Sequence, residues 1–160
     1  MKKKITLIVP VLFLGFALSG ILYAQTAEEF EQQGIDHFRK AFYEAVPQKD
    51  KTRAQAEYGN AEKAFQEAIR KKPDRVEPYL HLGRTYFVQK KYQQAGEVYR
   101  EAIRLAPERK PVYLQLASAL EMKGDYAGAI RVLKQLKARE TDERAIQILD
   151  GFIGELEKKM

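Results

Sequence analysis

Very few side chains in this sequence could perform covalent chemistry. The only histidines are His37 and His81, and neither has a second candidate ligand at a spacing that metal sites use. There is no cysteine, which excludes thiolate nucleophiles, thiolate metal sites and disulfides. The sequence also lacks a glycine-rich phosphate loop and a serine nucleophile motif. We therefore expect no enzymatic activity, no cofactor and no metal.

Many of the charged side chains form short clusters that suit the ends of helices. Glu28–Glu29 and Asp142–Glu143 each precede a periodic apolar stretch, where carboxylates offset the positive end of a helix dipole. Lysines and arginines gather at residues 70–75 and 104–110, near predicted helix C-termini. Compensation of the dipoles is the favoured interpretation of these basic clusters, and contact with anionic lipid is the alternative.

The net charge of +6 overstates how basic most of the chain is. Three lysines occupy positions 2–4, and the residues after position 24 carry 25 basic and 22 acidic side chains. A surface that binds nucleic acid needs a dense basic stripe, which this mixed distribution does not provide. We therefore expect no nucleic-acid partner.

An internal repeat with a period of 34 residues is the strongest pattern in the chain. A period of this length in a helix-forming sequence is typical of a stack of helix-turn-helix units, of which about three are needed to bury a continuous core. The repeat is visible in four series: Tyr58, Tyr92 and Tyr126; Ala61, Ala95 and Ala129; Phe65, Tyr99 and Leu133; and Pro73, Pro107 and Thr141.

The starts and ends of the expected helices can be placed by their capping residues. Thr26, Thr52 and Asp74 are each followed three residues later by Glu or Gln, which is the pattern of a capping box. We therefore expect helices to begin at these three positions. Pro73 and Pro107 each follow a helical apolar pattern and are expected to end it.

The C-terminal residues predict one further helix that caps the stack. Gly124–Asp125 indicates a turn, and Asp142–Glu143 indicates the start of the last helix. We expect one apolar face on this helix and a polar face opposite, as the terminal element of a solenoid requires. The predicted apolar stripe consists of Ile146, Leu149, Phe152, Ile153 and Leu156.

Residues 76–109 resemble the tetratricopeptide repeat. That family's pattern places large aromatic, small and leucine–glycine positions at fixed spacing and ends in a proline. Tyrosine stands here at the first aromatic position, where the family has tryptophan. The matching positions are Tyr79, Leu82, Gly83, Tyr86, Ala95, Tyr99, Ala102 and Pro107.

The neighbouring units match this pattern less closely. In residues 110–141, Leu136 and Thr141 replace the family's small residue and proline. Residues 26–75 match if Gly34 is the family's glycine, in which case both helices and the turn of this pair are longer than usual. The resemblance thus implies an all-α solenoid over residues 26–160, with about three repeats and residues 142–160 as a capping helix.

The resemblance also implies a concave groove, because the first helix of each pair lines one in this family. Exposed apolar surface rimmed by polar groups favours a partner-binding site, and Arg84 could pair with a carboxylate of the bound segment. The alternative is that some of these residues pack against the lengthened first pair. The groove residues that the resemblance assigns are Glu77, Leu80, Arg84, Phe87, Val88, Leu114, Ser118, Glu121 and Met122.

Residues 1–24 have the composition of an export segment. Three lysines follow Met1, and an uncharged, mostly apolar run extends from Ile5 to Ala24. The run is long for a cleaved signal peptide and close to the length that spans a bilayer. Cleavage and retention as a signal-anchor in the inner membrane, through residues 5–24, both remain open. In either case we expect the rest of the chain to be exported, either periplasmic or anchored facing the periplasm.

These patterns together favour a non-catalytic protein–protein interaction module, a scaffold of the bacterial cell envelope. Its expected partner is a peptide or helical segment of another protein, held in the groove. The alternative is a fixed structural subunit or assembly factor of an envelope machine that builds pili, exports polymers or assembles outer-membrane proteins.

Overall fold

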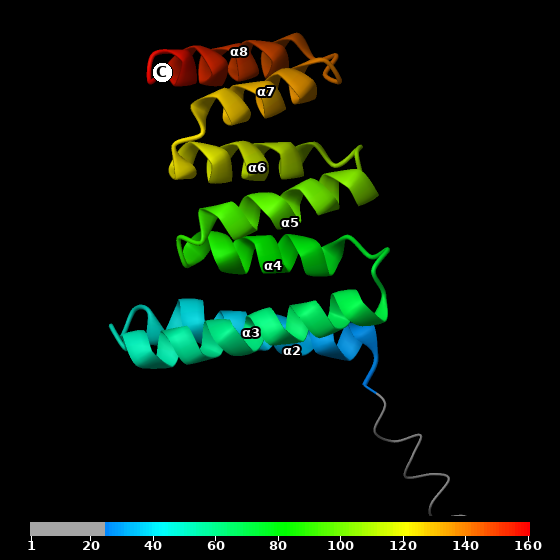
Figure 1. Ribbon diagram of the computed structural model, residues 1–160, viewed down its shortest axis with the longest axis vertical. Helices are drawn as coiled ribbons and strands as arrows, with labels where there is room; N and C mark the ends of the chain where they lie inside the picture. Colours follow the sequence, from blue (N-terminus) through cyan, green and yellow to red (C-terminus); the bar gives the residue numbers. More distant parts are fainter. Residues whose placement is uncertain (1–24) are drawn as a thin grey trace, which may run out of the picture.

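The computed structural model describes residues 25–160, a region that is helical throughout and contains no β-strand. Figure 1 shows its helices stacked in chain order along one axis. The expected all-α, helix-turn-helix stack is therefore confirmed, while the predicted signal or anchor at residues 1–24 lies outside the described residues. The elements are α2 (Ala27–Arg39), the π-helix η1 (Lys40–Ala45), α3 (Lys51–Lys71), α4 (Glu77–Val88), α5 (Tyr92–Leu105), α6 (Lys110–Lys123), α7 (Tyr126–Lys137) and α8 (Glu143–Glu157).

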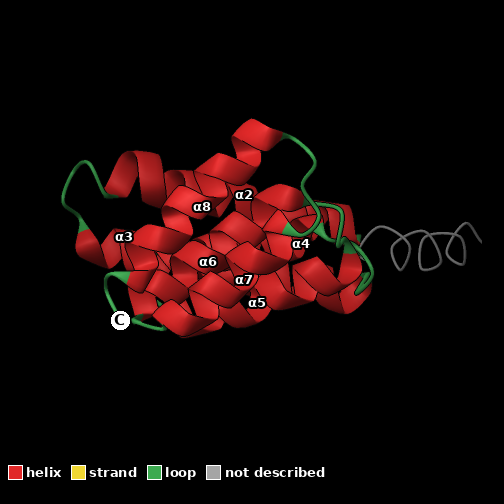
Figure 2. Ribbon diagram, turned by 90° about the horizontal axis from the view of Figure 1, so that it is seen from above, coloured by secondary structure: helices red, strands yellow, loops and turns green. Residues whose placement is uncertain are grey.

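Each helix packs mainly against the helices next to it in the chain. The pairs α2–α3, α4–α5 and α6–α7 form three hairpins, and α3–α4, α5–α6 and α7–α8 join them into one column. Figure 2, seen along the column, shows the helices superimposed within one narrow outline. In the described part of the chain, none of the helices is both long and apolar enough to cross a bilayer.

A glycine and an aromatic ring form the closest contact within each of the first two hairpins. A Cβ atom at Gly83 would lie 2.5 Å from Cε1 of Tyr99. At Gly34 it would lie 2.5 Å from Cε1 of Phe65. Because the two contacts are equivalent, Gly34 is the glycine of the first unit, as the sequence predicts. Only a residue without a side chain lets the two helices approach this closely.

A tyrosine hydroxyl ties each of the second and third hairpins to the turn before it. The Tyr79 hydroxyl donates a hydrogen bond to the carbonyl oxygen of Pro73, at 3.0 Å. The Tyr113 hydroxyl does the same to Pro107, at 3.1 Å. These bonds satisfy a carbonyl group just past a helix C-terminus, where no intrahelical donor is available.

The turn inside each hairpin contains one residue with left-handed backbone. These residues are Lys49 with φ of 60°, Lys90 with φ of 62° and Gly124 with φ of 88°. Glycine adopts this conformation freely, whereas a lysine there costs about 1–2 kcal/mol. The third turn, with Gly124, is therefore the easiest of the three to predict from the sequence.

The expected capping box at the start of α2 is confirmed. The Thr26 hydroxyl accepts a hydrogen bond from the backbone N–H of Glu29 at 3.2 Å. The Glu29 carboxylate accepts one from the backbone N–H of Thr26 at 3.0 Å. Two N–H groups that have no partner inside the helix are satisfied in this way.

The capping boxes predicted at Thr52 and Asp74 are wrong. Helix α3 already begins at Lys51, and Asp50 caps it by accepting a hydrogen bond from the backbone N–H of Arg53, at 2.9 Å. Thr52 therefore lies inside the helix. Helix α4 starts after Val76 without any side-chain cap, and Pro78 in its first turn removes one of the N–H groups that would need a partner.

Two apolar clusters stabilise the stack. The main one runs through all three hairpins to α8, and aromatic and aliphatic side chains fill it. A smaller cluster lies at the looped end of the α2–η1–α3 hairpin, which projects beyond α4 in Figure 1. Its buried residues are Ala41, Ala45, Ala54 and Tyr58, with Phe38, Phe42 and Val88 packed against them.

The last helix is less polar on its free side than the sequence suggests. Leu149, Ile153 and Leu156 are buried, as expected for the apolar stripe. Phe152, however, is 51 % exposed, and Ile148 one turn before it is 58 % exposed. Helix α8 therefore covers the column with one face and presents apolar side chains on another.

Candidate partner-binding groove

The first helices of the three hairpins, α2, α4 and α6, line a groove together with the capping helix α8. The groove is made of three consecutive pockets. We call them the first, central and third pockets. Arg84 borders both the first and the central pocket, and Leu114 and Ser118 border both the central and the third. The three pockets are therefore parts of one surface that runs along the column.

The central pocket lies between α4 and α6 and has a volume of about 360 Å³. Its walls combine aliphatic, aromatic and polar side chains, so that an apolar group could be buried beside hydrogen-bonding partners. Its lining consists of Arg84, Phe87, Val88, Tyr99, Leu114, Gln115 and Ser118.

Most of the residues predicted for the groove meet in this pocket. Arg84, Phe87 and Val88 come from one turn of α4, and Leu114 and Ser118 come from successive turns of α6. Because residues three and four apart share one face of a helix, each helix presents its set to the same space. Their role in binding stays a prediction, but the structure brings these five residues together.

The remaining predicted residues lie elsewhere on the same helices. Glu77 accepts a hydrogen bond from the Arg109 guanidinium at 2.6 Å. Leu80 is half-buried against the main core. Glu121 borders the third pocket and pairs with Lys159 at 2.6 Å, and Met122 is 55 % exposed but lines none of the three pockets.

Two of the predicted residues on α4, Phe87 and Val88, both pack against neighbouring side chains and line the groove. Val88 packs against the small cluster of the first hairpin. Phe87 meets the ring of Tyr92 edge-on, with centroids 5.5 Å apart. Both side chains are half-buried and still line the central pocket. Packing on one side therefore fixes the orientation of the surface that they present on the other.

Gln115 and Tyr99 line the central pocket but were not predicted as groove residues. Gln115 is adjacent to Leu114 on α6, whereas Tyr99 comes from outside the first helices. Tyr99 belongs to α5, a second helix, and reaches the groove because Gly83 leaves the space between the helices open. Its ring is 2 % exposed, and burial raises the pKa of its hydroxyl to about 12. The hydroxyl is therefore protonated at neutral pH, so that Tyr99 adds no charge to the pocket floor.

The first pocket lies between α2–η1 and α4 and has a volume of about 240 Å³. Its aromatic rings and arginines come from the lengthened hairpin and from α4. The groove predicted from the sequence covers residues 77–122 only and lacks the contribution of the hairpin. The lining consists of Ile35, Phe38, Arg39, Tyr43, Phe65, His81 and Arg84.

The third pocket lies between α6 and α8 and has a volume of about 220 Å³. Phe152 borders it, which explains why this ring is exposed. Its two acids, Glu121 and Glu155, are each paired with a lysine at 2.6 Å. Its lining consists of Leu114, Ala117, Ser118, Glu121, Leu133, Phe152, Glu155 and Leu156.

The two ends of the groove differ in charge. Within residues 25–160, neither Arg39 nor Arg84 forms an ion pair with a carboxylate. His81 does not add to this charge at neutral pH, because burial lowers its pKa below the usual value of 6.5. The first pocket is thus positive, whereas the acids of the third pocket are neutralised by their lysines.

The two histidines of the described region each form a pair with one carboxylate. Over residues 25–160, no group of three His, Asp or Glu side chains comes together as a metal ion would require. His37 and His81 each contact a carboxylate, Glu57 at 2.6 Å and Glu31 at 3.7 Å respectively. The groove combines apolar contact surface with side chains that can form hydrogen bonds, as sites that bind a ligand do.

The fold and the groove define a solenoid of helix-turn-helix repeats. One tetratricopeptide repeat family model matches residues 53–110, and a second one matches residues 87–149. The two matches together span more than half of the chain, and the chain belongs to the tetratricopeptide repeat family. No curated protein matches it in sequence.

Solved structures of the same fold come from several sources. The TPR2B domain of yeast Sti1, solved as a complex with pHsp70, has a TM-score of 0.63 and 19 % identity, over 84 % of this chain and 98 % of the other. The translocator chaperone SycD of Yersinia enterocolitica type III secretion has a TM-score of 0.62 and 16 % identity, over 88 % and 92 %. PcrH, solved with the chaperone-binding region of PopD, has a TM-score of 0.61 and 18 % identity, over 86 % and 98 %.

Proposed function

We propose that this protein is a non-catalytic interaction module that holds a segment of a partner protein in its groove. The observation that carries the proposal is the central pocket, where five of the predicted groove residues meet around an open, largely apolar space. The structures of Sti1 and PcrH mentioned above are complexes of the same fold with protein segments. A partner segment would bury apolar groups against Phe87, Val88 and Leu114, and Ser118 could hydrogen-bond its backbone.

We place this module in the bacterial cell envelope. The support is the basic start and the apolar run of residues 1–24, which have the composition of an export segment. Export leaves the groove in the periplasm, whether residues 1–24 are removed or stay as an anchor. N-terminal sequencing of the protein from cell fractions tests this part. Recovery of the chain from the cytoplasm with residues 1–24 intact would contradict it.

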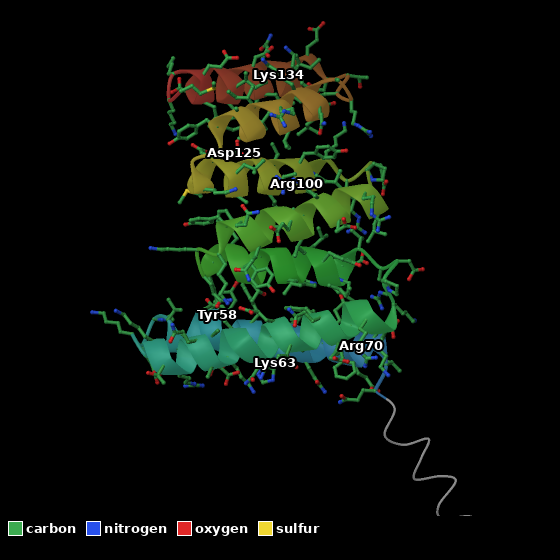
Figure 3. The ribbon with its side chains drawn as sticks, viewed as in Figure 1. Tyr58, Lys63, Arg70, Arg100, Asp125 and Lys134 are labelled. Carbon is green, nitrogen blue, oxygen red and sulfur yellow. The ribbon has the colours of Figure 1, made fainter. Side chains whose placement is uncertain are left out.

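Site-specific photo-crosslinking in cells tests the groove. A benzophenone amino acid at Leu114, whose side chain is 40 % exposed, should crosslink to a discrete partner. The matched control position is Lys63, which Figure 3 shows on the edge of α3 that faces away from the column. The substitution Ser118→Trp fills the central pocket from an exposed position and should abolish the Leu114 crosslink. Equal crosslinking from both positions, or crosslinking that survives Ser118→Trp, would refute groove binding.

A further inference from the structure

The first pocket has a composition unlike that of the other two. Ile35, Phe38 and Phe65 make its walls apolar, and Phe65 is stacked on the ring of His81 with centroids 5.4 Å apart. Arg39 from α2 and Arg84 from α4 border the same space. A positive charge on either side of an apolar pocket is complementary to an acidic group flanked by apolar ones.

The Arg84 guanidinium is held in place before any partner binds. It lies over the ring of Phe38, with 5.0 Å from Cζ to the ring centroid. A cation over an aromatic face is stabilised there and still leaves its N–H groups free. A guanidinium whose position is already fixed loses little conformational freedom on binding a carboxylate, so the pair is stronger than one between mobile side chains.

The carboxylate that approaches the histidine of this pocket is engaged elsewhere. Glu31, which approaches His81 at 3.7 Å, accepts a hydrogen bond from the Arg75 guanidinium at 2.8 Å. That same arginine also binds Glu28, at 2.6 Å. The protein's own acids therefore do not neutralise Arg39 and Arg84, and the charge of the pocket is available to a ligand.

The π-helix adds an aromatic rim to the pocket. Tyr43 lies in η1, is 63 % exposed and borders the first pocket. It touches the neighbouring Phe42 ring edge-on, at 5.0 Å between centroids. π-helical turns occur often at functional sites. An exposed tyrosine above an apolar pocket can cover a bound side chain and contribute contact area at low entropic cost.

We propose that the first pocket selects partner segments that carry an aspartate or glutamate side chain next to bulky apolar residues. The carboxylate binds between Arg39 and Arg84, under Tyr43. The neighbouring apolar side chains enter the central and third pockets, against Leu114 and Phe152. This inference rests on the proposed function, because it names the chemistry of the segment that the groove holds and the end at which the acid lies.

A peptide selection with the full chain in detergent micelles tests the inference. A library of random 16-residue peptides is displayed on phage at the N-terminus of the coat protein, so that no peptide has a free C-terminal carboxylate. Peptides enriched on the immobilised protein are then synthesised with an amidated C-terminus and a fluorophore. We expect enrichment of Asp or Glu beside aromatic or aliphatic residues. Fluorescence anisotropy gives the dissociation constants.

Charge reversal tests the contribution of the two arginines that border the first pocket. The double variant Arg39→Glu/Arg84→Glu should weaken binding of the selected peptides by about tenfold per arginine. The matched control is Arg100→Glu/Arg131→Glu, which reverses two exposed arginines that line none of the three pockets and should change affinity by less than about twofold. A peptide with Lys in place of its acid should recover affinity for the Arg39→Glu/Arg84→Glu protein. Circular dichroism confirms that each variant is folded.

The possible failures are distinguishable. If Ser118→Trp abolishes peptide binding but Arg39→Glu/Arg84→Glu leaves it unchanged, the acidic selectivity is wrong and groove binding stands. The selectivity is also wrong if the enriched peptides lack acids. If the library yields no binder, or if Ser118→Trp has no effect on those obtained, the proposed function fails and the inference fails with it.

Discussion

The first hairpin and the second are built on the same contact but differ in length. Gly34 meets Phe65 as Gly83 meets Tyr99. Yet α2 with η1 has 13 and 6 residues where α4 has 12, and α3 has 21 where α5 has 14. The additional turns lie at the looped end, where they form a small core of their own and one wall of the first pocket. A repeat can therefore gain the wall of a pocket without any change at its glycine–aromatic contact.

The largest effect should come from removing the aromatic partner in either hairpin. Phe65 is 1 % exposed and Tyr99 is 2 % exposed. Phe65→Ala and Tyr99→Ala should each lower the free energy of unfolding by about 3–5 kcal/mol, measured by urea denaturation. As a control, Phe152→Ala removes a ring that is half exposed and should cost less than about 1 kcal/mol. A much smaller loss for Phe65→Ala than for Tyr99→Ala would show that the two contacts are not equivalent.

Adding a methyl group to the glycine of either contact should have a smaller effect than removing the ring. Gly34→Ala and Gly83→Ala each push against a buried ring and should cost about 1–3 kcal/mol, because the ring has to move. Gly151→Ala is the matched control, since a Cβ there meets nothing within 4 Å. It should instead stabilise α8 by about 0.5–1 kcal/mol, as alanine favours helix. Thermal or urea unfolding of the three variants measures the difference. Stabilisation by Gly34→Ala would separate the first hairpin from the second.

The start of α3 offers a smaller test, because the hairpin uses a side-chain cap where α4 has none. Asp50→Ala should lower the free energy of unfolding by about 1 kcal/mol, since the N–H of Arg53 loses its acceptor. Thr52→Ala should change it by less than about 0.5 kcal/mol, because Thr52 lies inside the helix and is exposed. Urea unfolding of both variants, compared with wild type, decides which residue caps the helix.

The smallest effect concerns the ion pairs that tie α2 to the turn between α3 and α4. A hydrogen bond from Lys72 lowers the pKa of Glu28 from 4.5 to about 2, and the nearby Arg75 acts in the same direction. The unfolded chain therefore binds a proton at a higher pH than the folded one. This contribution to stability is present above pH 4.5 and is lost as the pH falls towards 2.

The variant Glu28→Gln lacks that contribution at every pH. Its urea midpoint should lie below that of wild type at pH 7, and the difference should shrink as the pH falls from 4.5 towards 2. Because Glu28 is exposed to solvent, the difference should be small at pH 7 and smaller still in high salt. A difference that is constant from pH 7 to pH 2 would contradict the assignment of the carboxylate to these ion pairs.

The comparison of the two hairpins also shows what could be predicted from the sequence. The 34-residue period and the position of Gly34 determined the order of the helices and the lengthening of the first pair. Helix caps were less predictable, because Thr52 has the capping-box spacing to Gln55 although Asp50, which lacks it, is the residue that caps α3. The π-helix could not be foreseen, because its hydrogen-bond register is set by the packing of the hairpin tip and has no signature in the types of residues 40–45.

The candidate groove was predictable only in its central part. The resemblance identified residues on α4 and α6, and five of them meet as the family's geometry implies. Arg39 and Tyr43 were not identified, because the family's pattern matches the first helix of the lengthened pair only at Gly34 and assigns no groove positions after it. Phe152 was assigned to the buried stripe of α8. Its exposure depends on how α8 lies on α7, which the sequence period does not determine.

The hydrogen bond from each tyrosine to the preceding proline has a consequence for how such a chain can grow. The carbonyl of Pro73 receives Tyr79, and the carbonyl of Pro107 receives Tyr113. Both units thus end in the same connector. A duplicated copy of residues 76–109, spliced in after Arg109, would find at Pro107 the docking point that Tyr79 uses now. The stack could be lengthened by one hairpin, and the groove by one pocket, with a connector of the existing type.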